Sequence, residues 1–166
     1  MRILVPLLLV SSVIGLFSSG CSVQKGEGFA IYLTAQENPG EWPPSAAPEI
    51  TGEPVIAITD IESYDRNHHE LTLTQSAIEK LAKLDVPMDG REFAVCVNGE
   101  VIYTGAFWTP FSSLTYNGPV IVIPFDSQNT RSVKIELGYP SGSFFTGSDP
   151  RSDPKIFAGL AGRIVG

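Results

Sequence analysis

Two histidines and four carboxylates lie within the eleven-residue segment 60–70, and these side chain types could bind a metal ion. They are Asp60, Glu62, Asp65, His68, His69 and Glu70. Imidazole nitrogens and carboxylate oxygens are ligands that zinc and other divalent ions accept. Because His68 and His69 are adjacent, an extended backbone directs their side chains to opposite faces, and both cannot easily reach one ion. The segment is therefore interpreted as a solvated turn leading into a strand, and a weak metal site formed by Asp65, His68 and His69 is the alternative.

The sequence shows no nucleophile with a recognisable activating partner. Cys96 lies between Val95 and Val97, where a cysteine usually behaves as a small buried apolar residue. Hydroxyl side chains are frequent later in the chain, but the following ones lie in no Gly-x-Ser-x-Gly or Ser-x-x-Lys arrangement: Ser112, Ser113, Thr115, Ser141 and Ser143. We therefore expect no catalytic residue, no cofactor and a non-enzymatic function.

Four aromatic residues lie close together and suggest a binding surface. They are Phe107, Trp108, Phe111 and Tyr116. Loops that carry several aromatic side chains can supply the anchors on which binding energy concentrates. The alternative is that these rings close one end of the hydrophobic core. The Trp42-Pro43-Pro44 loop has two similar interpretations, a recognition element or a stiff connector.

The N-terminal residues have the pattern of an export signal. Arg2 precedes an apolar run over residues 3–17, and small residues follow at 18–20. The run is shorter than the ~20 residues that a transmembrane helix needs. Cys21, directly after the small residues, resembles the acylated cysteine in the lipobox of bacterial lipoproteins. This resemblance implies cleavage before Cys21 and a lipid anchor in the cell membrane or the outer membrane; an ordinary secretory signal is the alternative.

Charge and cysteine content exclude two classes of protein. The chain has only two cysteines, so acylation of Cys21 leaves Cys96 without an intramolecular disulfide partner and excludes a disulfide framework. Residues 1–20 contain one basic residue and no acid, so their removal changes the formal net charge from −7 to −8. An acidic protein is a poor ligand for nucleic acid. We expect a polar linker over 21–28 and a single domain over 29–166.

The spacing of apolar residues predicts several strands and one amphipathic helix. The strands are expected at 29–34, 54–61, 70–74, 93–97, 100–103, 120–123 and 132–137. The helix is expected over 74–84, with Thr74 or Ser76 as its cap, and a shorter helix at 155–160. Asn98-Gly99 predicts a type I′ turn between two antiparallel strands. The order of elements predicts an α+β fold with one main helix packed on one face of an antiparallel or mixed sheet.

Two segments on either side of the expected helix resemble a known family. They read Glu70-Leu71-Thr72-Leu73-Thr74 and Gly90-Arg91-Glu92-Phe93-Ala94-Val95-Cys96-Val97-Asn98-Gly99-Glu100-Val101-Ile102. Over about residues 55–125 the chain is similar to the extracytoplasmic head subdomain of the protein-export subunit SecD. The resemblance implies a fold and a location outside the cytoplasm, and suggests contact with polypeptide. It implies no catalytic residue, and a shared fold alone does not transfer a function.

The sequence therefore predicts a lipid-anchored extracytoplasmic module that binds an envelope protein or peptide through a sheet edge or its aromatic loop. The aromatic residues between 107 and 116 are the candidate partner-binding residues. The alternative is a lipoprotein that binds a small ligand or a divalent metal through the acidic and histidine segment 60–70.

Overall fold

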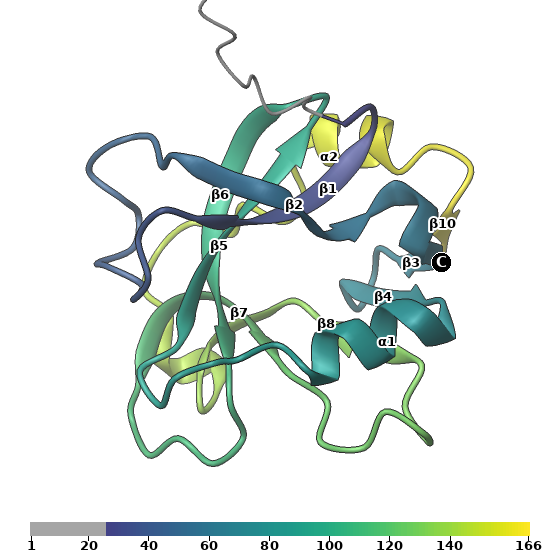
Figure 1. Ribbon diagram of the computed structural model, residues 1–166. Helices are drawn as coiled ribbons and strands as arrows, with labels where there is room; N and C mark the ends of the chain where they lie inside the picture. The colour runs from purple at the N-terminus through teal and green to yellow at the C-terminus, as the bar shows by residue number, and fades with distance from the viewer. Residues whose placement is uncertain (1–25) are drawn as a thin grey trace, which may run out of the picture.

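Residues 26–166 are the part of the chain that the computed structural model describes. The predicted signal peptide and Cys21 lie outside the described residues. Figure 1 shows two β-sheets, with the longer helix beside the smaller one.

The larger sheet has six strands in the order β2-β1-β5-β6-β7-β9. They are β1 (Phe29–Thr34), β2 (Ile50–Ala57), β5 (Arg91–Val97), β6 (Glu100–Trp108), β7 (Tyr116–Val122) and β9 (Glu136–Tyr139). All neighbouring strands are antiparallel except β6 and β7, which run parallel. Because β1 lies between β2 and β5, the segment 55–125 does not form this sheet without residues 29–34.

The smaller sheet has four strands in the order β10-β3-β4-β8. They are β3 (Ile61–Asp65), β4 (Glu70–Leu73), β8 (Ser132–Lys134) and β10 (Ile164–Val165). The helical elements are α1 (Gln75–Ala82), α2 (Pro154–Gly159) and two 3₁₀ turns, η1 (Ile58–Asp60) and η2 (Gly142–Phe144). The α+β class, the mixed strand directions and the single main helix are confirmed.

Local signals account for the β5–β6 hairpin and for α1. Asn98 and Gly99 have φ angles of 50° and 76°, as a two-residue type I′ turn requires. The Thr74 side chain accepts a hydrogen bond from the Ala77 N–H and caps α1. The helix ends at Ala82, and its face formed by Ala77, Ile78 and Leu81 is buried. The predicted hairpin and helix are confirmed, and the helix stops two residues earlier than expected.

Two segments predicted as continuous strands change from one sheet to the other. Segment 54–61 is interrupted by η1, where the Asp60 carboxylate accepts a hydrogen bond from the Ala57 N–H. Segment 132–137 is interrupted at Ile135, whose N–H donates to the His69 carbonyl. The structure therefore has two sheets where one was predicted, because apolar spacing does not reveal which strand pairs with which.

The main core lies between the two sheets and also includes buried side chains of both helices. On β5, Phe93 and Val95 belong to this core, whereas Ala94 and Cys96 form a second cluster with β1 residues on the outer face of the larger sheet. Because side chains alternate along a strand, β5 is buried on both faces. The loop 35–49 packs on the outer face through Trp42, which contacts a third cluster containing Trp108.

Gly90 and Gly52 provide a matched test of this outer-face packing. Both have positive φ angles, +87° and +63°, but a Cβ at Gly90 would lie 2.4 Å from the Trp108 ring, whereas a Cβ at Gly52 would meet nothing within 4 Å. Gly52→Ala should lower the free energy of unfolding by about 1–2 kcal/mol through backbone strain. Gly90→Ala should cost about 1–3 kcal/mol more through overpacking. Equal losses in urea denaturation would contradict the packing of Trp108 against Gly90.

Candidate functional site

The structure separates the four candidate aromatic residues into a buried group and an exposed one. Phe107, Trp108 and Tyr116 have at most 8% of their surface exposed, whereas Phe111 is 67% exposed. The prediction that all four form a partner-binding surface is therefore corrected. The alternative interpretation, that such rings close one end of the core, describes the three buried ones.

The buried rings pack tightly at the end of β6. Trp108 stacks on Tyr116 with a centroid distance of 5.5 Å and an interplanar angle of 20°, and it also contacts Tyr139 at 5.5 Å. Burial and the nearby Glu92 charge raise the pKa of Tyr116 above its usual value. These contacts hold together the strand ends from which the exposed loops extend.

Phe111 belongs to a group of exposed apolar side chains that we call the apolar apex. Its members are Met88, Phe111, Leu114 and Phe125, and their exposed fractions lie between 48% and 81%. The rings of Phe111 and Phe125 come from different loops and meet edge to face at 5.6 Å. Phe125 is not among the residues predicted from the sequence, although an isolated aromatic between Pro124 and Asp126 in a polar segment is a signal of exposure.

Ser112 organises the loops that carry the apex. Its hydroxyl donates to the Met88 carbonyl at 2.5 Å and accepts the Leu114 N–H at 3.1 Å. Its own carbonyl accepts the Tyr139 hydroxyl at 3.3 Å. The hydroxyl and the carbonyl of buried Ser112 thus tie its own loop to Met88 and to Tyr139 of β9. Such preorganisation reduces the entropy that a surface loses on binding.

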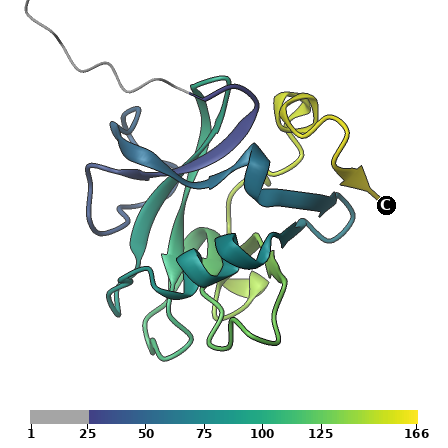
Figure 2. The ribbon, with the colours of Figure 1, turned by 45° about the vertical axis from the view of Figure 1, so that its right-hand side comes forward.

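The apex lies at the opposite end of the strands from the start of the described chain. The Gly28 N–H donates to the Asn98 side chain, which places the N-terminal end beside the β5–β6 turn. β6 and β7 are parallel and end together at Trp108 and Val122, immediately before the apex loops. β6 has nine residues, so roughly 25 Å separates the two ends. Figures 1 and 2 show the same arrangement from two directions.

The structure brings Asp65 and His68 together but directs the third candidate metal ligand, His69, elsewhere. His68 Nδ1 lies 2.7 Å from Asp65 Oδ2, and Asp65 Oδ1 accepts the N–H groups of Asn67 and His68. His69 is buried, and its Nδ1 lies 2.8 Å from the Tyr64 hydroxyl. The turn before β4 is present as expected, but His69 is not solvated. Within residues 26–166 no group of three or more histidine, cysteine or acidic side chains is arranged to hold a metal ion.

Burial also changes the acid–base behaviour of the Tyr64–His69 pair. Burial raises the pKa of Tyr64 to about 12. Burial, and secondarily the charge of Arg151, lower the pKa of His69 below its usual value. Arg151 is itself bound to Asp149 through two of its nitrogens, at 2.8 and 2.9 Å, and holds the Asp149 pKa low. These surroundings therefore favour the neutral form of the His69 imidazole.

Cys96 is buried on the outer face of the larger sheet, in the position expected of an apolar residue.

No helix in the described part of the chain is long and apolar enough to cross a membrane. In comparisons with models of protein families, with curated proteins and with solved structures, nothing matches this chain. Function must therefore be argued from this chain's own geometry.

Stability should fall as the pH decreases through the region where free histidine titrates. The His69 pKa is lowered in the folded state and is about 6.5 in the unfolded state. Below that pH the unfolded chain takes up the proton first, so the free energy of unfolding decreases. His69→Asn, which tolerates the φ of 51° at this position, should reduce the slope between pH 7.5 and about 5.

The matched control is His68→Asn, because His68 is exposed and its loss should leave the slope in place. Asp65 and Asp149 have lowered pKa values, so they affect stability only at more acidic pH, near and below about 4. Chemical denaturation at several pH values measures the slope. An unchanged slope in His69→Asn would show that the buried ring is not its source.

Proposed function

We propose that this chain is a non-enzymatic, lipid-anchored extracytoplasmic module that binds a partner protein through its apolar apex. The observation that carries the proposal is the exposed Phe111–Phe125 ring pair, held on loops at the far end of the strands from the N-terminal side of the domain. The export signal pattern and Cys21 support the location and the anchor.

Leaving these two apolar rings exposed to water is unfavourable in free energy. Phe111 and Phe125 are 67% and 81% exposed, and burying a phenylalanine side chain stabilises a complex by about 1.5–3 kcal/mol. Met88 and Leu114 extend the same surface. Grouped apolar side chains of this kind mark interaction sites, and paired aromatic anchors are typical of binding hot spots.

A protein partner fits this position better than the anchoring membrane does. The described chain begins at the end of the domain that contains the β5–β6 turn, so a lipid on Cys21 would be connected at that end. The apex lies at the opposite end of the strands. Exposed acidic residues, Asp85, Asp89 and Asp126, flank the apex in sequence. We therefore expect a partner with an apolar cleft for two rings and basic residues around it, because complementary charge directs association.

The similarity to the SecD head stays a prediction, and the proposal does not depend on it. If the similarity is correct, the partner belongs among proteins that handle exported polypeptide. Binding through the apex requires only that some envelope protein offers a matching cleft.

The apex predicts a specific loss of binding. Replacing both Phe111 and Phe125 with serine should remove most cross-links between this chain and its partner in intact cells, because the two anchors are lost together. The control is Val165→Ser, which removes an exposed apolar side chain from β10, outside the apex. Mass spectrometry of cross-linked envelope proteins measures the result. Identical cross-links in the double variant would contradict the proposal.

The proposed lipid anchor predicts the mass of the mature protein and its recovery in the membrane fraction. Intact mass of the membrane-derived protein should correspond to a chain that begins at Cys21 and carries acyl groups. Cys21→Ala should lose both the added mass and membrane association, since each buried methylene contributes ~0.8 kcal/mol to anchoring. An unmodified wild-type chain released from the membrane would show that the export signal is an ordinary secretory one.

A further inference from the structure

Glu92 on β5 is a buried acidic side chain with few partners. Its exposed fraction is 5%, and it lies on the outer face of the larger sheet. The Thr34 hydroxyl lies 2.6 Å from Oε2. Within the described chain, Oε1 accepts no hydrogen bond, and no basic side chain forms an ion pair with this carboxylate. Removing a carboxylate from water is costly unless a cation or several donors compensate.

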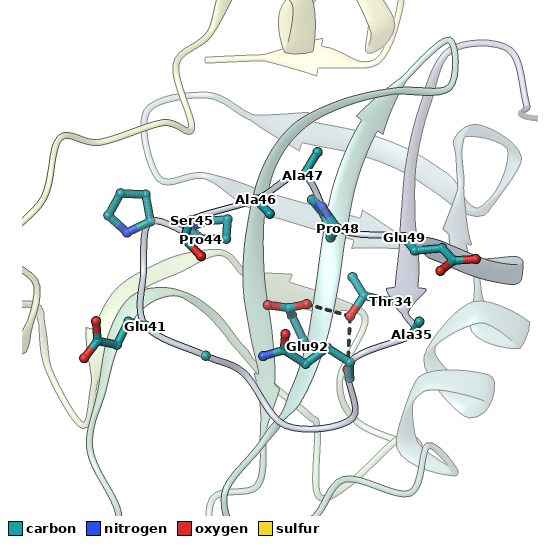
Figure 3. Close-up of a pocket in the computed structure, with 13 residues that line it drawn as sticks. Thr34, Ala35, Glu41, Pro44, Ser45, Ala46, Ala47, Pro48, Glu49 and Glu92 are labelled. Carbon is teal, nitrogen blue, oxygen red and sulfur yellow. Dashed lines mark hydrogen bonds between the residues drawn. The ribbon is translucent and has the colours of Figure 1, made fainter.

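The open oxygen of Glu92 faces a cavity. Figure 3 shows the carboxylate below the segment 44–48, with one oxygen hydrogen-bonded to Thr34 and the other directed away from Thr34. The cavity has a volume of about 540 Å³, is partly open to solvent, and lies between the sheet and the loop 35–49. Its size lies within the range of small-molecule binding sites. Pro44 and Pro48 form apolar parts of the cavity lining, and Gln36 and Ser45 contribute neutral polar groups to it.

The loop over the cavity is held in place at both its base and its middle. At the base, the Ala35 N–H donates to the Glu49 carbonyl at 2.8 Å. In the middle, the Trp42 indole N–H donates to the Thr104 carbonyl at 3.1 Å. The prolines in the loop restrict its backbone further. These contacts fix the loop over the cavity, which lowers the entropic cost of binding.

The charges around the cavity select a cation. No lysine, arginine or histidine lines it, and two further acids, Glu41 and Glu49, lie exposed at its edge. A hard divalent ion needs six or more oxygen ligands, and no three acidic side chains in the described chain are grouped to provide them. The walls are partly apolar, so an organic cation suits them better than a metal ion.

We propose that this cavity binds a primary ammonium group on a short aliphatic stem, with the ammonium against Glu92 Oε1 and the stem against the proline rings. A guanidinium group binds a carboxylate best through both oxygens. Here Oε2 is already engaged by Thr34, so a single compact charge fits the one open oxygen. The ammonium belongs either to a free amine or to a lysine side chain of a peptide.

Titration of the full-length chain in detergent micelles tests the site. The probes are n-butylammonium, n-butylguanidinium and the blocked peptide Ala-Lys-Ala, followed by calorimetry and by the amide NMR signals of Thr34 and Ser45. n-Butylammonium should bind more tightly than n-butylguanidinium. Binding of the peptide in addition to the amine identifies a lysine side chain as an accepted source, and binding of the amine alone identifies a small free ligand. Failure of every probe to bind would overturn the proposal, as would a preference for guanidinium.

Glu92→Gln should weaken binding of the ammonium probes roughly ten- to a hundredfold, because it removes a charge-assisted hydrogen bond but keeps an acceptor for Thr34. Glu53→Gln is the matched control and should change affinity by less than about twofold, since that carboxylate is exposed on β2 and lies outside the cavity lining. Ala46→Trp fills the cavity from an exposed loop position without changing the core. It should abolish binding even if Glu92→Gln fails to fold. Unchanged affinity in a folded Glu92→Gln variant, or in Ala46→Trp, would refute the site.

Discussion

The burial of β5 on both faces is the constraint on which the rest of the structure depends. Successive side chains of a strand point to opposite sides, so one layer of protein cannot cover both. The four-stranded sheet and α1 cover the inner side. On the outer side, the irregular loop 35–49 packs through Trp42 against the cluster around Trp108. The Glu92 cavity lies between this loop and the sheet.

Local sequence signals predicted the parts of the fold that local interactions determine. Asn98-Gly99 specified the hairpin turn, and Thr74 with the apolar stripe after it specified α1. The sheet arrangement depends on contacts distant in sequence. Nothing near residues 29–34 indicates that β1 pairs with β5 some sixty residues later, and nothing in the alternation of 132–137 indicates that Ile135 separates two sheets. Pairing partners are chosen by tertiary packing, which spacing alone does not encode.

The candidate sites were predictable to different extents for the same reason. Aromatic content identified the region of the apex, but whether a ring is buried depends on the loop and strand beside it. Trp108 and Phe111 are three residues apart, yet one is 2% and the other 67% exposed. Glu92 looked like an ordinary hairpin residue in the sequence. Its role as the floor of a cavity requires a loop fifty residues earlier in the chain to fold over it.

The central position of β1 has a mechanical consequence. A tethered protein is pulled from its anchored end, and here any such force enters the domain at β1, which is hydrogen-bonded on both sides. A load between that end and the apex runs along the strand axes, whereas the interstrand hydrogen bonds lie across them. The strands must then slide past one another with several bonds breaking together, instead of separating one bond at a time. If the chain is anchored at Cys21 as proposed, this strand arrangement resists unfolding under tension between the anchored end and the apex.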